Sequence, residues 1–382
     1  MVEYLEFLHL GYQPSKNDLV ATFRVEPAAG ISMKEAVARI ASESSTGTWT
    51  KELKTETAAV KRRLKRISAK AFYIRGNIAK VAYPSELFEP GNMPQILSCI
   101  AGNIFGMKAV KNLRLESIDF PEKIARSFKG PKFGIHGVRK LFGVKDRPLT
   151  ATVPKPKVGL NYKEYAKVGY EAWVGGIDLL KDDENLTSQS FINFEKRVVE
   201  CSKMRELAEK ETGEKKSFLI NVTAETNEML RRARLVKNLG FEYAMVDIVV
   251  AGWAGVQTLR DECEKLQLII HAHRAMHAAF DRYVRHGISM LAIAQIARVI
   301  GVDQLHTGTA GVGKLESGEG ETERINKFLK SRFFGLRPIF PVASGGVHPG
   351  LVPELMQKLG SDIIIQAGGG VHALGARVGA AA

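Results

Sequence analysis

Two carboxylates follow a lysine in the segment GGIDLLKDDEN, residues 175–185. Asp183 lies two positions after Lys181, so in an extended segment the two side chains share one face of a strand, and Glu184 follows directly. A structural ion pair would explain this spacing, although a buried pair gains little net stability because desolvation offsets the attraction. The alternative is a cation site, since hard cations such as Mg²⁺ prefer oxygen ligands.

Two lysines flank a proline in the segment KPK, residues 155–157. A strand period of two places Lys155 and Lys157 on one face, and Pro156 indicates a strand end because it cannot donate to a sheet. A solvated pair of lysines is the simplest interpretation. A lysine that is crowded by other cations and partly desolvated has a lowered pKa, however, and such a lysine suits acid–base catalysis.

Three histidines and an arginine fall within the segment HAHRAMHAAF, residues 271–280. Zinc is a poor match, because no cysteine or second ligand pair accompanies them. They are either surface polar residues or a site in which His273 and His277 flank Arg274, whose guanidinium fork suits oxyanions.

Glycine-rich segments follow three further apolar runs. QLHTGTAGVGKLE (304–316) has the composition of either a hinge loop or a phosphate-binding loop. SGG (344–346) and GGG (368–370) are either tight turns or places where backbone N–H groups approach an anion.

Eight short apolar runs occupy the sequence from about residue 150 onward, each followed by a helix-like stretch. They are residues 151–156, 177–183, 218–224, 243–250, 268–273, 304–308, 339–344 and 362–368. Intervening segments such as 162–176 and 228–240 have helical periodicity and end in glycine, a common helix stop. This alternation predicts a (β/α)8 barrel, in which chemistry collects at the carboxyl ends of the strands, where all the segments described above fall.

The first 130 residues mix strand and helix patterns. Residues 20–27 and 78–84 read as strands, and residues 32–44 and 93–107 read as helices. We therefore predict a smaller ferredoxin-like α+β domain at residues 1–130, followed by the (β/α)8 barrel domain at residues 131–382.

The composition is that of a soluble globular protein, with 382 residues, 45% hydrophobic and 25% charged. We expect no membrane span, because no apolar run is long enough, and no secretory signal peptide, because the first twenty residues are mixed and charged. The cysteines Cys99, Cys201 and Cys263 are few and scattered, so we expect reduced thiols and a cytoplasmic location. The formal charge of +14 would attract nucleic acid, an anionic membrane or a phosphorylated substrate. No nucleic-acid-binding motif accompanies basic runs such as KRRLKR (61–66), which suit a solvated helix face.

These segments, in this order, resemble the large subunit of ribulose-1,5-bisphosphate carboxylase/oxygenase (RuBisCO), of the archaeal or form III type. The resemblance extends from about residue 10 to residue 375. In this family carbon dioxide adds to a lysine amine and forms a carbamate. The resemblance implies that the Lys181 carbamate, Asp183 and Glu184 hold one Mg²⁺ per site.

The resemblance also implies the other residue roles. Lys181 and Lys155 would transfer protons, with Lys157 in support, and His273 would be a proton donor or acceptor at the substrate. Lys314 would lie at the tip of a mobile lid hinged at Gly308, Gly311 and Gly313, where it would stabilise the incoming carboxylate. The substrate-binding residues implied are Arg274 and His306 for the two phosphates, His277 for positioning, and Ser344, Gly345, Gly346, Gly368 and Gly369 in the last two loops.

Two segments of the smaller domain complete the resemblance, ESSTGTWT (43–50) and GN (102–103). In this family Glu43, Thr48, Trp49 and Asn103 would cap the barrel mouth of a neighbouring subunit. The resemblance therefore implies a homodimer, or a higher multiple of dimers, with shared active sites. It also implies several dozen residues beyond Ala382, which falls inside the expected eighth helix, among them a tail that latches over the lid.

The implied enzyme is a carbon–carbon lyase that converts ribulose 1,5-bisphosphate, carbon dioxide and water into two molecules of 3-phosphoglycerate, with oxygenase side activity. Two alternatives remain open. A RuBisCO-like enolase or isomerase would act on a phosphorylated sugar and would not need Lys314. A nucleic-acid binder is suggested by charge alone, and the clustering of reactive residues at strand ends argues against it.

Overall fold

The computed structural model describes residues 4–47, 55–313 and 320–382. The chain forms two compact units: Met1–Lys129 with Met276–Val299, and Gly130–Ala275 with Ile300–Ala382. This grouping adds residues 276–299 to the first unit, and the division of the sequence at residue 130 stays a prediction. Of the predicted site residues, Thr48, Trp49 and Lys314 lie outside the described residues.

The first unit contains a five-stranded sheet in the order β10-β4-β1-β3-β2. Strands β1 to β4 pair antiparallel, while the short β10 lies parallel to β4. Helix α1 follows β1 and helix α3 joins β3 to β4, so the order βαββαβ confirms the predicted ferredoxin-like arrangement. The strands are β1 (Asp18–Pro27), β2 (Lys70–Arg75), β3 (Ile78–Pro84), β4 (Val110–Asp119) and β10 (Gly287–Ile288), and the helices are α1 (Met33–Glu43), α2 (Ala58–Ile67), α3 (Met93–Ile100), α4 (Glu122–Ala125), α10 (Ala278–Asp281) and α11 (Met290–Ile300).

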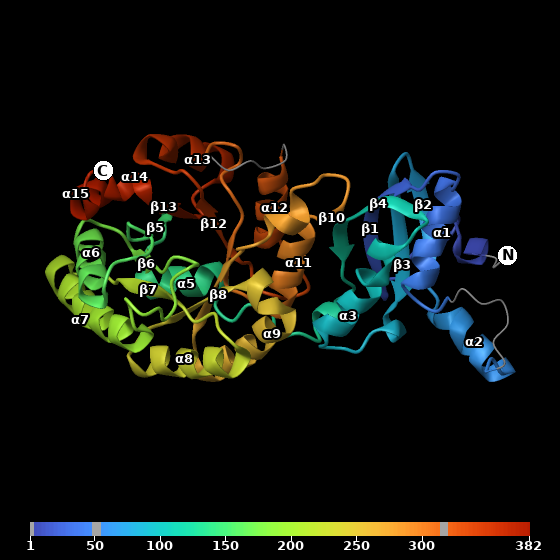
Figure 1. The fold of residues 1–382 in the computed structure, drawn as a ribbon, viewed down its shortest axis with the longest axis horizontal. Helices are drawn as coiled ribbons and strands as arrows, with labels where there is room; N and C mark the ends of the chain where they lie inside the picture. The colour runs from blue at the N-terminus through green and yellow to red at the C-terminus, as the bar shows by residue number, and fades with distance from the viewer. Residues whose placement is uncertain (1–3, 48–54, 314–319) are drawn as a thin grey trace. The chain divides into compact units, whose positions relative to one another are not determined.

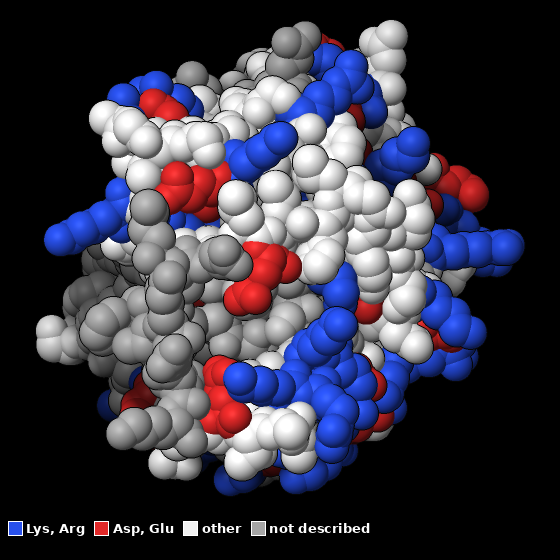
Figure 2. Space-filling view, turned by 90° about the vertical axis from the view of Figure 1, so that its right-hand side faces the viewer, with Lys and Arg blue, Asp and Glu red and all other residues white. Residues whose placement is uncertain are grey.

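Helix α2 is a basic and largely exposed element of the first unit. It contains the run KRRLKR, and none of its residues is buried. Figure 2 shows Lys and Arg side chains gathered over part of one face of the chain. The helix therefore matches the predicted solvated basic face.

The second unit is a closed barrel of eight parallel strands, in the order β11-β12-β13-β5-β6-β7-β8-β9 (Figure 1). Each of the eight predicted apolar runs contains or overlaps one strand, so the predicted barrel is confirmed. The strands are β5 (Leu149–Thr152), β6 (Leu179–Lys181), β7 (Ser217–Asn221), β8 (Tyr243–Asp247), β9 (Ile269–His273), β11 (Gln304–His306), β12 (Phe340–Ser344) and β13 (Ile364–Ala367).

Helices alternate with these strands, as the periodicity predicts. Asn161 precedes helix α6 and forms a capping box with it, in which its side chain accepts from Glu164 N while the Glu164 carboxylate accepts from Asn161 N. The helices are α5 (Gly134–Phe142), α6 (Tyr162–Val174), α7 (Phe194–Thr212), α8 (Thr226–Asn238), α9 (Ile248–Leu266), α12 (Glu321–Lys330), α13 (Val352–Leu359), α14 (Gly369–His372) and α15 (Ala376–Ala381). In the described part of the chain, no helix has both the length and the apolarity that crossing a membrane requires.

One buried carboxylate joins three segments at the amino-terminal side of the barrel. Asp303 precedes β11, and its Oδ1 accepts hydrogen bonds from Phe133 N at 2.6 Å and Gly134 N at 2.9 Å. Its Oδ2 accepts from Ile270 N of β9 at 2.9 Å. The Asp303 side chain is fully buried, so no water can replace its carboxylate as the acceptor for these three backbone N–H groups.

Replacing Asp303 with Ala should therefore leave three buried N–H groups without partners. We expect a loss of about 3–6 kcal/mol in the free energy of unfolding, measured by chemical denaturation. Asp146 is exposed, and Asp146→Ala is the control that should stay within about 0.5 kcal/mol of the wild type. An Asp303→Ala variant as stable as this control would contradict the assigned role.

Candidate active site

Most of the barrel strands have a polar residue at their last position. Lys181 is the last residue of β6, Asp247 of β8 and His273 of β9. His306 ends β11 and Ser344 ends β12. Because all eight strands are parallel, these ends meet at the same mouth of the barrel.

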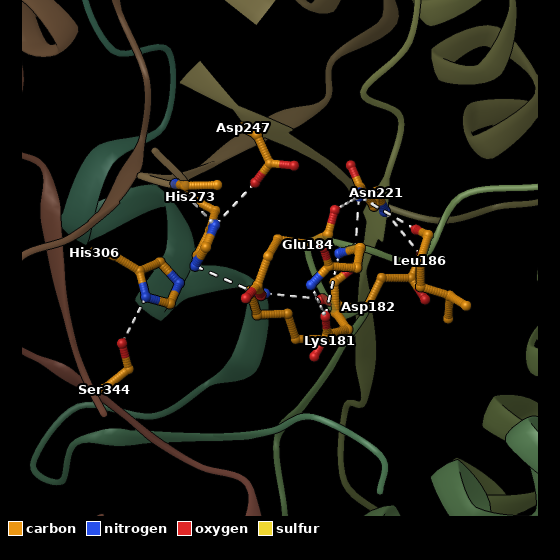
Figure 3. A network of polar contacts seen from close by, with 12 residues as sticks. Lys181, Asp182, Glu184, Leu186, Asn221, Asp247, His273, His306 and Ser344 are labelled. Carbon is orange, nitrogen blue, oxygen red and sulfur yellow. Dashed lines mark hydrogen bonds and ion pairs between the residues drawn. The ribbon is translucent and has the colours of Figure 1, made fainter. Parts of the chain in front are cut away.

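Lys181 is fully buried, with no exposed surface. Its Nζ donates to the backbone oxygen of Asp182 at 2.8 Å and lies 3.9 Å from Glu184 Oε2 (Figure 3). Burial lowers the pKa of the Lys181 amine below its usual value, and the negative charge of Glu184 opposes that shift. The amine is therefore desolvated while its nearest ionisable neighbour is a carboxylate.

Asp183 is turned toward the loop that follows β5. Its Oδ2 lies 3.5 Å from Lys155 Nζ, and its Oδ1 accepts from the backbone and side-chain nitrogens of Asn185 at 3.2 and 3.0 Å. Burial alone would raise the pKa of Asp183, but the Asn185 hydrogen bonds and the charges of Lys155 and Lys181 lower it. Asp183 is thus held as a carboxylate.

The expectation that Lys181 and Asp183 share a strand face is wrong, because β6 ends at Lys181. Asp183 and Glu184 instead belong to the loop after the strand, where the backbone turns. Similarly, β5 ends at Thr152, so Lys155 and Lys157 also lie in a loop. Lys155 reaches Asp183, whereas Lys157 is exposed.

Asp182, between Lys181 and Asp183 in the sequence, has a structural role. Its carboxylate accepts from Arg197 Nη2 at 3.0 Å, from Tyr165 OH at 2.8 Å and from Asn221 N at 2.9 Å. Asp182 and Arg197 are both fully buried, so the charge of Asp182 is paired away from the mouth. Only Asp183 and Glu184 of the three acids remain for a ligand.

Asn221, the last residue of β7, supports the loop that carries these acids. Its Nδ2 lies 3.5, 3.2 and 3.2 Å from the backbone oxygens of Asp183, Glu184 and Leu186 (Figure 3). The side chain is fully buried. One amide therefore holds the loop at three points.

His273 connects the acidic group to a second buried acid. Its Nδ1 lies 2.9 Å from Asp247 Oδ1, and its Nε2 lies 3.7 Å from Glu184 Oε2. Burial raises the pKa of Asp247 to about 6, and burial together with the nearby Lys181 charge lowers the pKa of His273 to about 3. The imidazole is thus neutral near pH 7 and oriented by a carboxylate.

His306 lies between two partners of its own. Its Nδ1 is 2.7 Å from Ser344 Oγ, and its Nε2 is 2.9 Å from His271 Nε2. The rings of His273 and His306 meet edge to face with centroids 4.7 Å apart. The structure therefore brings His273, His306 and Ser344 into one group.

Two of the predicted glycines, Gly308 of the hinge and Gly368 of the last loop, lie close to cationic side chains. A Cβ at Gly308 would lie 3.1 Å from Arg274 Nη2, and one at Gly368 would lie 3.1 Å from Lys155 Cε. Gly345 has a φ of 114°, a conformation that side chains rarely adopt. A larger residue at Gly308 or Gly368 would thus displace a predicted substrate-binding or catalytic group.

Three of the predicted residues, Glu43, Asn103 and His277, belong to the first unit. Asn103 Nδ2 donates to Glu43 Oε1 at 3.4 Å, so these two predicted partners are brought together. His277 Nδ1 lies 2.7 Å from Asp281 Oδ2. Their predicted contribution to a barrel mouth stays a prediction.

The donor set at the mouth fits a hard cation only if Lys181 is modified. Among the described residues, no group of three or more His, Cys, Asp or Glu side chains could hold a metal ion. Asp183 and Glu184 offer carboxylate oxygens, and Lys181 lies beside Glu184. A carboxylated Lys181 would add the third oxygen donor, so these residues fit Mg²⁺ in that form.

Sequence reasoning missed several residues of the site. Asp247, His271 and Asn221 were not singled out, although all three lie at or near carboxyl ends of strands. Gln304 and Asp182 were also overlooked. The rule that barrel chemistry collects at these ends would have identified Asp247 and Asn221, because each is the last residue of its strand.

The fold and the mouth define an enzyme of the (β/α)8 class with a lysine and two carboxylates at its centre. Residues 134–382 match the family "Ribulose bisphosphate carboxylase large chain, catalytic domain", and residues 6–124 match its N-terminal domain. A ribulose bisphosphate carboxylase of Pyrococcus horikoshii is 55% identical, over 99% of this chain and 88% of its own length. One from Archaeoglobus fulgidus is 47% identical, over 99% of this chain and 90% of its own length.

Solved structures agree with these matches. The octameric ribulose-1,5-bisphosphate carboxylase/oxygenase of Pyrococcus horikoshii, in complex with sulfate, has a TM-score of 0.94 and 55% identity, covering 99% of this chain and 89% of that one. A dimeric archaeal RuBisCO from Hyperthermus butylicus has a TM-score of 0.92 and 45% identity, covering 99% and 91%. This chain belongs to the ribulose bisphosphate carboxylase large chain family.

Replacing Asn221 with Ala should release the loop that carries Asp183 and Glu184. We expect faster backbone hydrogen exchange at residues 182–187 and a loss of about 1–3 kcal/mol of stability, because buried carbonyls lose their donor. Asn161→Ala removes a helix cap at a cost of about 1 kcal/mol and should leave exchange in this loop unchanged. Equal exchange of the loop in both variants would contradict the role of Asn221.

Proposed function

We propose that this chain is a ribulose-1,5-bisphosphate carboxylase that converts its substrate, carbon dioxide and water into two molecules of 3-phosphoglycerate, with oxygenase side activity. The observation that carries the proposal is the fully buried amine of Lys181 beside Glu184, with Asp183 held in the same loop. The relatives named above are carboxylases, which favours this reaction over an enolase or isomerase.

Activation begins at Lys181. The ammonium group first loses a proton. The neutral amine then attacks carbon dioxide, a C–N bond forms at the expense of one C–O π bond, and a second proton leaves, so the cation becomes an anionic carbamate. Burial favours the neutral amine because it lowers the pKa of Lys181. The new anion would stand beside Glu184, and a divalent cation is needed to offset that repulsion.

The Lys181 carbamate, Asp183 and Glu184 would hold one Mg²⁺ per site. When bound, this ion supplies a Lewis acid for the sugar oxygens. The chain's own residues then move the protons. The Lys181 carbamate is proposed to remove the C3 proton and form the enediolate. His273 and Lys155 serve the later proton transfers, and Lys157 supports Lys155.

His273 suits a proton role because Asp247 orients it and because its lowered pKa keeps it neutral. Lys155 Nζ lies beside Asp183 and against Gly368. Lys314, outside the described residues, is proposed to stabilise the carboxylate that forms when the enediolate attacks carbon dioxide.

The remaining predicted residues bind the substrate. Arg274 and His306 are proposed to serve the two phosphates, with His277 in a positioning role. Glycine backbones after β12 and β13 would approach phosphate, at the place where barrels commonly bind it. The residues of these loops are Ser344, Gly345, Gly346, Gly368 and Gly369.

Assembly follows the same reasoning. We propose a homodimer, or a multiple of dimers, in which Glu43, Thr48, Trp49 and Asn103 complete the barrel mouth of a neighbouring subunit. The structural relatives are octameric and dimeric, which supports this assembly.

We also propose that the domains divide near residue 130 and that the chain is of the archaeal form III type. We propose that it acts in the cytoplasm, where its three free cysteines would stay reduced. No nucleic-acid or membrane partner is proposed.

Replacing Lys181 with Ala should abolish carboxylation, because no carbamate can form. The assay measures acid-stable label from bicarbonate in purified protein supplied with ribulose 1,5-bisphosphate. Lys196→Ala, a change on helix α7, is the control and should keep turnover near the wild type. Wild-type-like turnover of Lys181→Ala would refute the mechanism.

Removal of divalent ions should also abolish turnover. We expect a chelator to eliminate activity, and preincubation with Mg²⁺ and bicarbonate together to restore it more fully than Mg²⁺ alone, because carbamate and cation stabilise each other. The same assay distinguishes a carboxylase from the enolase alternative. An enolase would exchange the C3 proton of the substrate but would not incorporate label from bicarbonate. Full activity in the chelator would exclude the proposed metal site.

A further inference from the structure

A hydroxyl group at the end of strand β5 connects that strand to the segment after β13. Thr152 is the last residue of β5 and pairs in register with Ala367, the last residue of β13. Its Oγ1 donates to the backbone oxygen of Ala367 at 2.7 Å and lies 3.1 Å from Nε2 of His372, in the short helix α14. Thr152 is fully buried, so its hydroxyl group bonds to these two partners and not to water.

The two contacts of this hydroxyl group determine where the proton of His372 lies. A hydroxyl group has one proton and a backbone oxygen can only accept, so Thr152 uses its proton on Ala367. Its oxygen then accepts a hydrogen bond from His372, whose proton is therefore on Nε2. The backbone oxygen of Val153 is a second acceptor for the same imidazole. His372 thus donates to the segment that leads from β5 to the predicted catalytic residue Lys155.

The side chain of Lys155 turns back over the start of the same short helix. A Cβ added at Gly368 would lie 3.1 Å from Lys155 Cε and 4.0 Å from the backbone oxygen of Val153. The backbone oxygen of Gly368 accepts from the backbone nitrogen of His372 at 3.2 Å. The loop after β5 therefore contacts both ends of this turn, since Lys155 crosses Gly368 and His372 binds Thr152.

Helix α14 is held in place by the rest of its unit. Val371 is 4% exposed and packs in one cluster with Ala172 and Ile177. A Cβ at Gly379 would lie 1.8 Å from the backbone oxygen of Val371, so helix α15 lies directly against this turn. The imidazole of His372 therefore extends from a packed support to the loop after β5.

The charge of Lys155 acts on this imidazole. Burial, and then the nearby Lys155 charge, lower the pKa of His372 to about 4, while the Val153 oxygen opposes that shift. His372 is therefore neutral near pH 7. A neutral donor holds the loop without placing a second positive charge beside the lysine.

We propose that His372 is a positioning residue that, through Thr152, fixes the loop carrying Lys155. The amine of Lys155 then stays beside Asp183, at 3.5 Å, where it serves the later proton transfers. A lysine side chain is a flexible stem, so a fixed loop is needed to confine its amine to a productive position. This inference rests on the proposed function for the role of Lys155.

The first experiment separates the later proton transfers from the first one. His372→Leu removes the donor, and it should lower kcat for carboxylation about tenfold, the effect of one lost hydrogen bond, with KM for ribulose 1,5-bisphosphate changed by no more than about twofold. Exchange of the substrate's C3 proton with solvent, which the proposed function assigns to Lys181, should fall by no more than about twofold. An equal loss of exchange and carboxylation would overturn the inference, because it would show a general defect of the site.

The second experiment tests the contact with Thr152. His372→Gln keeps an N–H donor, and its kcat should stay within about threefold of the wild type. Thr152→Val removes the acceptor and should lower kcat about as much as His372→Leu, and the double variant should lose no more than about twofold beyond either. His136→Leu, at an exposed histidine of helix α5, is the control and should keep kcat near the wild type. Additive losses in the double variant would overturn the inference.

Failure of the proposed function can be recognised separately. A wild-type protein without carboxylation would refute that function. Independently of turnover, backbone hydrogen exchange at residues 155–160 should be faster in His372→Leu than in the wild type or in His136→Leu, because the loop has lost its donor. Unchanged exchange of this loop, in a wild type that carboxylates normally, would overturn only the role of His372.

Discussion

The burial of one amine, that of Lys181, is the constraint on which the arrangement of the barrel mouth depends. A charged ammonium without water is costly, so the surrounding structure favours either a neutral amine or a close anion. Glu184 provides the anion, and burial lowers the amine pKa. The Asp182 carboxylate does not pair with the Lys181 amine, because it accepts hydrogen bonds from Arg197, Tyr165 and Asn221.

The barrel architecture explains how so short a strand can carry this chemistry. Strand β6 has three residues, and its neighbours β5 and β7 align with it in parallel. Asn221 of β7 then holds the acidic loop of β6 through three backbone oxygens. The support comes from the adjacent strand, so the position of Asp183 and Glu184 follows from strand order rather than from the loop sequence alone.

The fold was largely predictable from the sequence, because buried parallel strands leave apolar runs and amphipathic helices separate them. Strands β2 and β4 were missed, since their residues are partly exposed and mixed in character. The segment Lys181–Glu184 was found, but its geometry was misjudged because the strand ends at Lys181, two residues before Asp183. Gln304 and His271 contact each other across β9 and β11, and a single sequence does not contain that pairing. The carbamate and the residue roles came from family resemblance, and they stay predictions.

The central claim is that the Lys181 amine becomes an anionic oxygen donor. The most direct measurement is ¹³C NMR of the purified protein incubated with ¹³C-bicarbonate, with and without Mg²⁺. The account predicts a carbamate resonance that Mg²⁺ strengthens and that disappears in Lys181→Ala. A resonance that persists in Lys181→Ala, or none in the wild type with Mg²⁺ present, would contradict it.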